Sequence, residues 1–332
     1  MDNPVDGASP GPYRRASAPV RHRGARLARG TGKPGHEPDE ARWTEATDAQ
    51  RTSSPGAAPH GGRPTSKEVR LVSQRAPLPT RVDDLPDLAS AYAAALEPAL
   101  DLLGRRLGRP ALDDAGRRAV DDHVRLLLAW NTAINLTAIT DPASIARLHV
   151  IDSLTALPLL LDGPHATIVD LGSGGGFPGL ALAAALPATD VLLVDSVAKK
   201  TAFLEAAVRA TGLADRVVVA NRRAETLPRD RWDVVTARAV GGLAELVELA
   251  LPLLRRGGRL IAWKRGLRGE EMAAAGRAAS ALGGTEPRFL AVAADVAEAA
   301  GIAGHGFAVV EKVAPTPRAY PRDPAARKRE PW

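Results

Sequence analysis

The chain has 332 residues, 45% hydrophobic and 25% charged, which is enough for about two domains with a well-buried core. It contains no cysteine, which excludes a disulfide framework, a cysteine-ligated metal site and a thiol nucleophile. It has no continuous apolar run of the ~18 residues that span a membrane, and its first residues lack the pattern of a signal peptide. We therefore expect a soluble, cytoplasmic protein.

The formal net charge of +6 is concentrated at the two ends of the chain. Residues 1–85 and 312–332 each carry +4, whereas residues 86–311 carry −2. Residues 1–85 also contain 11 prolines and 9 glycines without sustained periodicity, a composition that buries too little apolar surface to offset chain entropy. We predict a disordered basic extension over 1–85 and a basic tail over 315–332, and such charge attracts polyanions.

A helical pattern begins after residue 85. Tyr92, Leu96 and Leu100 recur at helical spacing, although Pro98 should kink or restart that helix. A second helix is expected after Asp113, which is a plausible N-cap, and a third over about 142–161. These segments predict a small helical module over residues 86–165.

From residue 166 short apolar strands alternate with helices, which is typical of βαβ units in a parallel sheet. The expected strands are 167–171, 191–195, 216–220, 233–237 and 258–264, with two further candidates at 286–292 and 306–312. The expected helices are 178–186, 199–211, 242–254 and 270–282. We predict an α/β fold with an open doubly wound sheet over 166–314, in which the last strand could be an antiparallel edge.

The first strand runs into a glycine-rich loop, DLGSGGGFPG, from Asp170 to Gly179. Glycines there let the backbone approach a ligand at the carboxyl end of the sheet. From Gly174 the loop matches the dinucleotide pattern G-x-G-x-x-G, which places a pyrophosphate on a helix N-terminus. The register Asp170, Gly172, Gly174, Gly176 is instead that of class I methyltransferases. We favour S-adenosylmethionine, because a carboxylate suits its positive charges; a plain strand-to-helix turn is the structural alternative.

Two later strand ends fit an adenosine ligand. Asp195 follows Gly172 by 23 residues, about the spacing at which an acid hydrogen-bonds a ribose hydroxyl, although Asp195 could instead cap the next helix. The third strand leads to Arg222 and Glu225, where a backbone amide or the carboxylate could meet the adenine. Alone, such an acid is often only a solvated loop residue.

Seven sequence blocks, taken in order, resemble one known family. They are 130–139 (WNTAINLTAI), 149–154 (HVIDSL), 170–179 (DLGSGGGFPG), 195–204 (DSVAKKTAFL), 223–225 (RAE), 237–239 (ARA) and 251–258 (LPLLRRGG). Together they are similar to the ribosomal RNA small subunit methyltransferase G family, which methylates guanine N7 in 16S rRNA. The match covers about residues 95–265, and 316–322 (TPRAYPR) resembles the family's C-terminal end.

This resemblance implies a Rossmann-like class I methyltransferase sheet, preceded by a small helical module, that binds S-adenosyl-L-methionine. The partner it implies is 16S rRNA or the small ribosomal subunit. The cofactor contacts it implies are Gly172, Phe177, Ala224, Glu225 and Arg238, to which the strand-end argument adds Asp170, Gly174 and Asp195. Phe177 could pack over the cofactor or only between helix and sheet. Leu148 departs from the family, since many members have a basic or polar residue before the histidine equivalent to His149.

Methyl transfer from a sulfonium is an in-line displacement, and guanine N7 already carries a free lone pair. We therefore predict no acid–base residue, and expect the enzyme to act by positioning its reactants and excluding water. Because N7 must stay free, a donor can hold only O6 of the guanine. Arg238 and Lys264 are the candidates, although Arg238 could merely brace its loop.

RNA docking requires cations and stacking surfaces. The substrate-binding candidates are Asn135, His149, Asp152, Lys199, Lys200 and Arg222. Further cations at the rim and in the tail are Arg147, Arg223, Arg265, Arg268, Arg318, Arg322, Arg327, Lys328 and Arg329. Each could be only a solvated charge, and Asn135, His149 and Asp152 could merely tie helices together. We expect no metal, because His149 has no partner at ligand spacing, and we favour a monomer without membrane contact.

Three other functions stay open at this point. A small-molecule methyltransferase would have the same fold, and an NAD-dependent oxidoreductase would use the other glycine register. A ribosome-binding assembly factor could retain an inactive cofactor fold, although the intact Asp170, Gly172, Gly174 and Asp195 argue against it.

Overall fold

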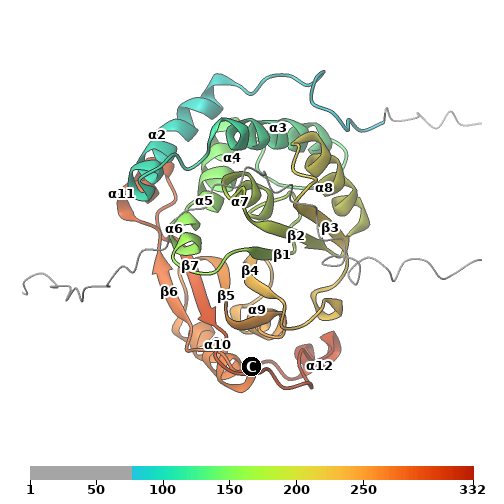
Figure 1. Ribbon diagram of the computed structural model, residues 1–332, viewed down its shortest axis with the longest axis vertical. Helices are drawn as coiled ribbons and strands as arrows, with labels where there is room; N and C mark the ends of the chain where they lie inside the picture. The colour runs from blue at the N-terminus through green and yellow to red at the C-terminus, as the bar shows by residue number, and fades with distance from the viewer. Residues whose placement is uncertain (1–76) are drawn as a thin grey trace, which may run out of the picture. The chain divides into compact units, whose positions relative to one another are not determined.

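The computed structural model describes residues 77–332, in which one sheet lies between layers of helices (Figure 1). Its strands are β1 (Thr167–Leu171), β2 (Asp190–Asp195), β3 (Val217–Asn221), β4 (Trp232–Arg238), β5 (Leu254–Arg265), β6 (Arg288–Ala291) and β7 (His305–Glu311). Its helices are α2 (Ser90–Leu107), α3 (Asp114–Asn131), α4 (Pro142–Ile145), α5 (Asp152–Leu154), α6 (Leu157–Leu161), α7 (Gly179–Ala185), α8 (Ala198–Ala210), α9 (Leu243–Ala250), α10 (Gly269–Leu282), α11 (Ala294–Ala300) and α12 (Pro324–Arg329).

The seven strands follow the order β3-β2-β1-β4-β5-β7-β6. Strands β1 to β5 pair in parallel, while β7 runs antiparallel to both β5 and β6. The predicted α/β doubly wound sheet is therefore confirmed. The last strand is antiparallel, as predicted, but it is not an edge, because β6 pairs with its outer side. The strand order reverses at β1, because β2 and β3 lie on one side of it and β4 and β5 on the other. The carboxyl ends of β2, β1 and β4 surround the crevice where such sheets bind ligands.

Side chains along the strands alternate between two hydrophobic cores. In β2, Val191 and Leu193 belong to one core, while Leu192 and Val194 belong to the other, as the two-residue period of a strand requires. The first core contains α7, α8 and the helices before residue 166, and the second contains α9 and α10 (Figure 1). Burial on both faces explains why these strands read as continuous apolar runs.

The helical module is more divided than predicted. Asp113 caps α3, accepting from Gly116 N at 2.7 Å, as predicted, and α2 continues through Pro98. The single helix expected over 142–161 is instead a series: α4, a π-helical segment (Ala146–Ile151), α5 and α6. Pro158 explains one break, because proline fits the first turn of a helix but not its interior.

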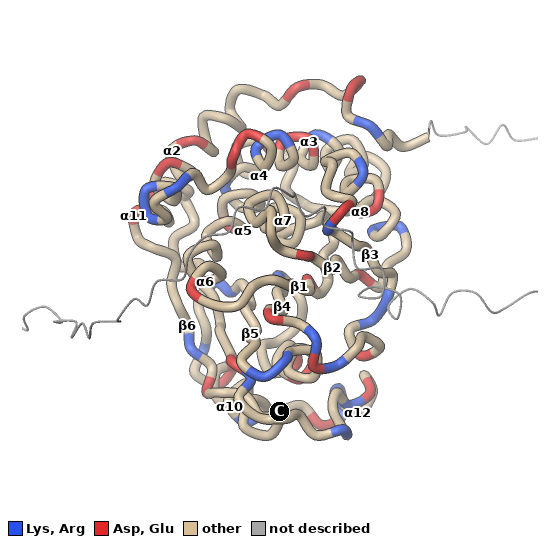
Figure 2. The backbone as a smooth tube through the Cα atoms, viewed as in Figure 1, with Lys and Arg blue, Asp and Glu red and all other residues tan. Residues whose placement is uncertain are grey.

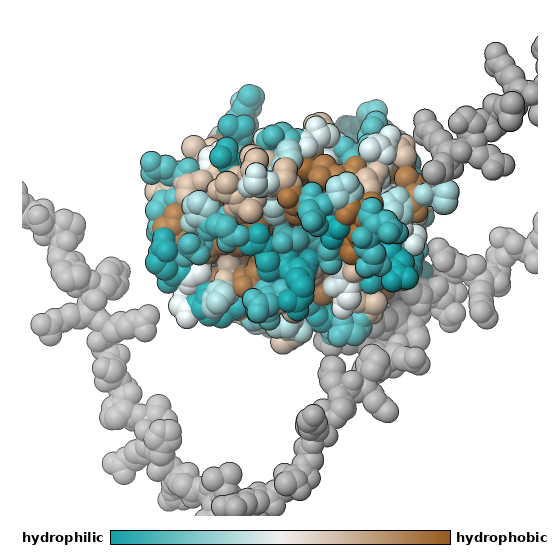
Figure 3. Space-filling view, turned by 90° about the horizontal axis from the view of Figure 1, so that it is seen from above, coloured by the Kyte–Doolittle hydropathy of each residue, from teal (hydrophilic) through white to brown (hydrophobic). Residues whose placement is uncertain are grey.

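The same run, Pro142–Leu161, is long and apolar enough to cross a membrane by length and composition, yet 61% of it is buried inside the structure. It therefore serves as part of a protein core. On the face drawn in Figure 3, hydrophilic side chains predominate and hydrophobic ones form small, separate groups. Among residues 77–332, the exposed large hydrophobic side chains are Leu161, Val197 and Val313.

Residues 77–85, expected to belong to the disordered extension, pack against the helical module. Trp130 Nε1 donates to the carbonyl of Pro79 at 2.6 Å, and Arg125 donates to the carbonyls of Leu85 and Pro86. The predicted disorder over 1–76 lies outside the described residues. Neither α11 nor α12 was predicted from the sequence.

Candidate active site

The glycine loop lies at the carboxyl end of β1, where the sequence placed it. Gly172, Gly174 and Gly176 have positive φ angles of 69°, 54° and 88°, which residues with a side chain rarely adopt. Gly172 N donates to the carbonyl of Val194 at 2.8 Å. A Cβ atom on Gly172 would lie 2.5 Å from Val240 Cγ2. The conformation of the loop therefore requires its glycines, in addition to any ligand they admit.

Asp170 lies beneath this loop and does not face a pocket. Its side chain is fully buried, Oδ1 accepts from Thr236 Oγ1 at 2.8 Å, and Oδ2 accepts from Gly179 N at 3.2 Å. Burial raises its pKa to about 6, because the charged form loses its hydration. Asp170 thus ties β1 to β4 and to the start of α7. The direct cofactor contact predicted for this carboxylate does not fit its buried position.

Asp195 closes the loop from the end of β2. Its Oδ2 accepts from Gly174 N at 3.0 Å and its Oδ1 from Val197 N at 2.9 Å. Both oxygens thus hold backbone amides, and the second bond lies just before α8, close to the capping role considered from the sequence. The ribose contact of Asp195 stays a prediction.

Phe177 packs between two histidines of the helical module. Its ring centroid lies 5.1 Å from that of His149, with the planes 15° apart, and 4.4 Å from that of His123. Burial lowers the pKa of both histidines, and at His149 the nearby Arg238 charge adds to this effect, so that both pKa values lie at about 4. Both rings are therefore neutral at pH 7. They form an uncharged wall beside the loop.

His123 is a site residue that was not predicted from the sequence. Its Nε2 lies 2.8 Å from the carbonyl of Gly175, so it supports the glycine loop directly, and its buried Nδ1 has no hydrogen-bond partner among residues 77–332. The only sequence signal is a histidine on the apolar face of α3. Because core histidines give the same pattern, that signal does not distinguish a site from a core.

Arg238, at the end of β4, is held by the helical module. Its Nη1 donates to the carbonyl of Leu148 and to Asp152 Oδ2, both at 3.1 Å, and its Nη2 lies 3.3 Å from His149 Nδ1. The carbonyl belongs to the π-helical segment, and such segments are frequent at functional sites. Because arginine only donates, His149 Nδ1 accepts, and its Nε2 then donates to Thr137 Oγ1 at 2.8 Å.

Asp152 joins this arginine to two more strands. Its Oδ1 lies 2.8 Å from His305 Nδ1 at the start of β7, and its carbonyl accepts from Trp263 Nε1 of β5 at 2.8 Å. Asp152 is 3% exposed. Lys264, the other candidate for guanine O6, pairs instead with Glu271 of α10 at 2.6 Å.

These elements meet at a pocket of about 220 Å³ above the glycine loop. The predicted site residues that line it are Gly172, Gly174, Phe177, His149, Lys200 and Arg238. The predicted residues outside its lining are Asn135, Asp152, Asp170, Asp195, Lys199, Arg222, Ala224, Glu225 and Lys264. The structure therefore brings the loop, the aromatic ring and the arginine together, while several predicted residues support or flank them.

The basic tail is not a free cationic arm. Arg322 pairs with Glu248 at 2.7 Å and Arg327 with Glu225 at 2.5 Å, and acidic and basic residues lie together around α12 (Figure 2). Their charges are already paired within the protein, and contact of these two arginines with RNA stays a prediction. Glu225 itself lies in a 3₁₀ turn (Ala224–Thr226) that follows β3.

The sequence of this chain is similar to that of one known protein family. A family profile described as rRNA small subunit methyltransferase G matches residues 117–297. A protein named ribosomal RNA small subunit methyltransferase G from Roseiflexus castenholzii is 42% identical over 224 residues, 66% of this chain and 91% of its own. The protein of that name from Listeria innocua is 34% identical over 225 residues, 66% of this chain and 92% of its own.

Among solved structures, the antibiotic-resistance methyltransferase Kmr has 18% identity and a TM-score of 0.38, covering 48% of this chain and 92% of that one. The profile match extends from α3 through α11, and so includes the glycine loop, Phe177 and Arg238. The chain belongs to the rRNA small subunit methyltransferase G family.

Proposed function

We infer that this chain transfers a methyl group from S-adenosyl-L-methionine to N7 of a guanine in 16S rRNA. The observation that carries this conclusion is the pocket of the family's glycine loop, where Gly172, Phe177 and Arg238 meet at the carboxyl end of β1. An rRNA substrate places the enzyme's work in the cytoplasm, on free rRNA or on the small ribosomal subunit. We favour a monomer that requires neither metal nor membrane.

The loop fits the cofactor on its own geometry. Among the described residues, a Cβ atom on Gly174 would meet only the carbonyl of Gly172 within 4 Å, at 3.7 Å, so the space above this part of the loop is open to a ligand. Asp195 holds the amide of Gly174 and so fixes the loop before any ligand binds. We propose that Ala224 and Glu225, in the turn after β3, flank the adenosine end of the cofactor.

When bound, S-adenosyl-L-methionine supplies an electrophilic methyl group. Guanine N7 has a lone pair and no proton, so the protein's residues need to orient two reactants and exclude water. His149 and His123 suit the exclusion of water, because their low pKa values keep both rings neutral. Neither is needed as a base. Arg238 fixes the helical module against the strand ends, and Phe177 fills the space between them. Contact between Arg238 and guanine O6 stays a proposal.

We assign the RNA contacts to basic residues around the strand ends. Lys199 and Lys200 begin α8, while Arg222 and Arg223 follow β3. Phosphate contacts from such residues give affinity that falls steeply with salt.

The geometry disfavours the NAD alternative. A pyrophosphate would need the N-terminal amides of α7, yet Gly179 N already donates to the buried carboxylate of Asp170. That amide is therefore not available to a second anion, and the buried negative charge of Asp170 would oppose one there. No contact in the described residues favours a small-molecule substrate over rRNA.

Mapping 7-methylguanosine in 16S rRNA from cells with and without this gene tests the proposal. We expect one guanine to lose its methylation without the gene and to regain it when the gene is restored. A parallel titration of the purified protein should show binding of S-adenosylhomocysteine but not of NAD. An unchanged methylation map, or a preference for NAD, would refute the proposed function.

A further inference from the structure

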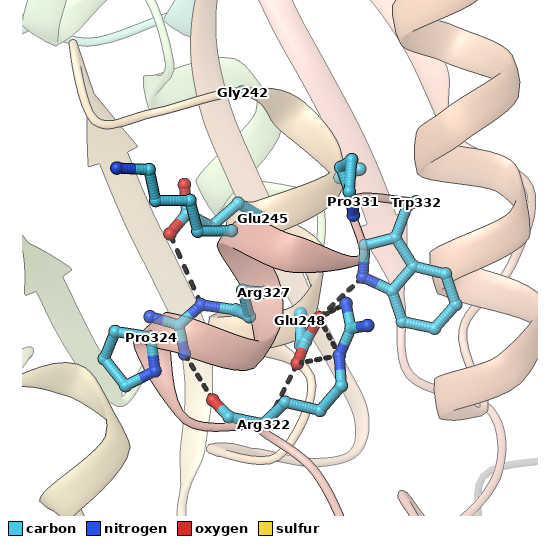
Figure 4. Close-up of a pocket in the computed structure, with 10 residues that line it drawn as sticks. Gly242, Glu245, Glu248, Arg322, Pro324, Arg327, Pro331 and Trp332 are labelled. Carbon is cyan, nitrogen blue, oxygen red and sulfur yellow. Dashed lines mark hydrogen bonds and ion pairs between the residues drawn. The ribbon is translucent and has the colours of Figure 1, made fainter.

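The C-terminal segment, residues 316–332, is docked against α9 (Figure 4). Arg327 also joins it to the turn after β3. Arg229 holds its beginning, donating to the carbonyl of Thr316 at 2.9 Å. Arg322 forms two-pronged hydrogen bonds with the carboxylate of Glu248, which is 0% exposed, and Trp332 Nε1 donates to the same carboxylate at 2.6 Å. The segment is therefore anchored at its start, its middle and its end without any help from Arg327.

Arg327 occupies the space between these anchors and the turn after β3. Its Nη2 donates to Glu225 Oε1 at 2.5 Å, its Nε to Glu245 Oε1 at 3.3 Å, and its Nη1 to the carbonyl of Arg322 at 2.6 Å. The Arg327 side chain is 8% exposed. Arg329, on the same short helix, is exposed and has no ion pair within the part of the chain that the structure describes. The two arginines thus differ in what they contact while sharing one helix.

We propose that Arg327 is a positioning residue for the cofactor, which acts by holding the carboxylate of Glu225, so that the C-terminal segment forms part of the cofactor site. The inference rests on the proposed function, which places Ala224 and Glu225 at the adenosine end of the cofactor. Glu225 belongs to a turn of three residues, and its side chain would otherwise sample several rotamers. A carboxylate that is ordered before binding avoids part of the entropic cost of ordering it on binding.

The ion pair also keeps Glu225 charged. Partial burial by itself raises the pKa of Glu225 and is the largest single effect. The hydrogen bond and the charge of Arg327, a backbone hydrogen bond and the charge of Arg223 together outweigh it, and the pKa lies below its usual value. An ionised carboxylate accepts hydrogen bonds only. It can therefore receive a ribose hydroxyl or an adenine amino group with the oxygen lone pairs that Arg327 leaves free.

A merely structural role for Arg327 makes a different prediction. If Arg327 only clasped the tail, its loss would lower the melting temperature and would affect the cofactor and the fold together. Because Arg229, Arg322 and Trp332 anchor the segment independently, we expect the Arg327→Ala variant to stay folded with the tail docked. Its effect should appear in cofactor affinity.

The experiment measures binding of S-adenosylhomocysteine to the full chain by calorimetry. The test variants are Arg327→Ala, Arg327→Lys, Glu225→Ala and the double variant Arg327→Ala/Glu225→Ala. The matched control is Arg329→Ala. We expect Arg327→Ala to bind about tenfold more weakly, since a hydrogen bond between charged groups is lost. Arg327→Lys should recover part of the loss, and Arg329→Ala should bind as the wild type does. The double variant should bind no more weakly than Glu225→Ala. In turnover, KM for S-adenosylmethionine should rise while kcat changes less than about twofold.

Each contrary outcome has its own meaning. Wild-type affinity in Arg327→Ala, with weakened binding in Glu225→Ala, would overturn the inference and leave the proposed function intact. Additive losses in the double variant would also overturn it, because the two residues would then act independently. Failure of the wild-type chain to bind S-adenosylhomocysteine would instead overturn the proposed function and the inference with it.

Discussion

Acid should destabilise this fold through the buried histidine that supports the glycine loop. His123 is 1% exposed, and burial lowers its pKa from about 6.5 to about 4. Between these two values the unfolded chain binds a proton that the folded chain refuses, so stability increases with pH across this window. The full contribution is present above about pH 6.5 and is lost as the pH falls toward 4. With ~1.4 kcal/mol for each pKa unit, the histidine accounts for about 3 kcal/mol of stability.

Urea unfolding between pH 4.5 and 7.5 measures this effect when wild type is compared with His123→Leu. The leucine variant also loses the contact with Gly175, so it should be less stable at pH 7. The comparison that matters is therefore the slope. We expect the unfolding free energy of the wild type to change by about 1.4 kcal/mol per pH unit more than that of the variant between pH 6 and 4.5. The other titrating groups contribute to both curves and cancel in this difference, apart from His149, whose pKa the His123 charge also lowers.

Parallel curves for the two proteins would refute this reasoning, because they would show that His123 titrates alike in the folded and unfolded states. A protonated His123 would need acceptors for both ring nitrogens, yet Nδ1 has none in the structure. His149 should steepen the curves of both proteins in the same direction, since burial and the Arg238 charge lower its pKa as well.

Three further predictions concern the loop, the arginine network and the RNA surface. Gly179→Ala should destabilise the fold by about 1–3 kcal/mol, because the alanine Cβ would lie 2.3 Å from Leu193 Cδ2 and 2.8 Å from Asp170 Oδ2. Thermal unfolding measures this loss, and an unchanged melting temperature would contradict it. Asp152→Asn should lower the free energy of urea unfolding by about 3 kcal/mol and reduce kcat, because it leaves Arg238 buried without its counter-charge. A stability equal to that of the wild type would show that the carboxylate is dispensable. Arg222→Ala should weaken binding to 16S rRNA fragments and reduce the slope of log affinity against log salt by about 1; a slope equal to the wild-type value would remove Arg222 from the RNA surface.

The sheet was predictable because its signal is local. Strand β1 has the predicted bounds, Thr167–Leu171, and the other parallel strands overlap their predictions, since five or so consecutive apolar residues between turns indicate a strand buried on both faces. The glycine loop was predictable for the same reason, because its residues are consecutive in the sequence. Even the inward direction of Asp170 is implied by parity, because Val169 and Leu171 face one core and Asp170 must face the other way.

The support of the site was less accessible, because it depends on contacts between distant segments. Asp152 meets Arg238 across 86 positions of sequence and His305 across 153. No spacing rule indicates such pairs. The π-helical segment adds to the difficulty, since its sequence predicts an ordinary helix and only packing shows that it offers a carbonyl to Arg238.

The C-terminal tail shows the limit of counting charges. Its excess of basic residues predicts a polyanion partner, but Arg322 and Arg327 pair with Glu248 and Glu225, 74 and 102 positions earlier in the chain. Net charge states how many cations a segment has and not which of them are already neutralised.

The distribution of charge around the pocket suits the two ligands of the proposed reaction. A sulfonium would be repelled by an unpaired arginine in the same pocket, but Arg238 lies 3.1 Å from Asp152, and the adjacent His149 is neutral. Arg238 can therefore order the helical module without opposing the cofactor. Lys200, at the start of α8, also lines the pocket, and its neighbour Lys199 is exposed. A phosphate backbone would thus be attracted to this edge of the site, while the positively charged methyl donor lies beside the neutralised arginine.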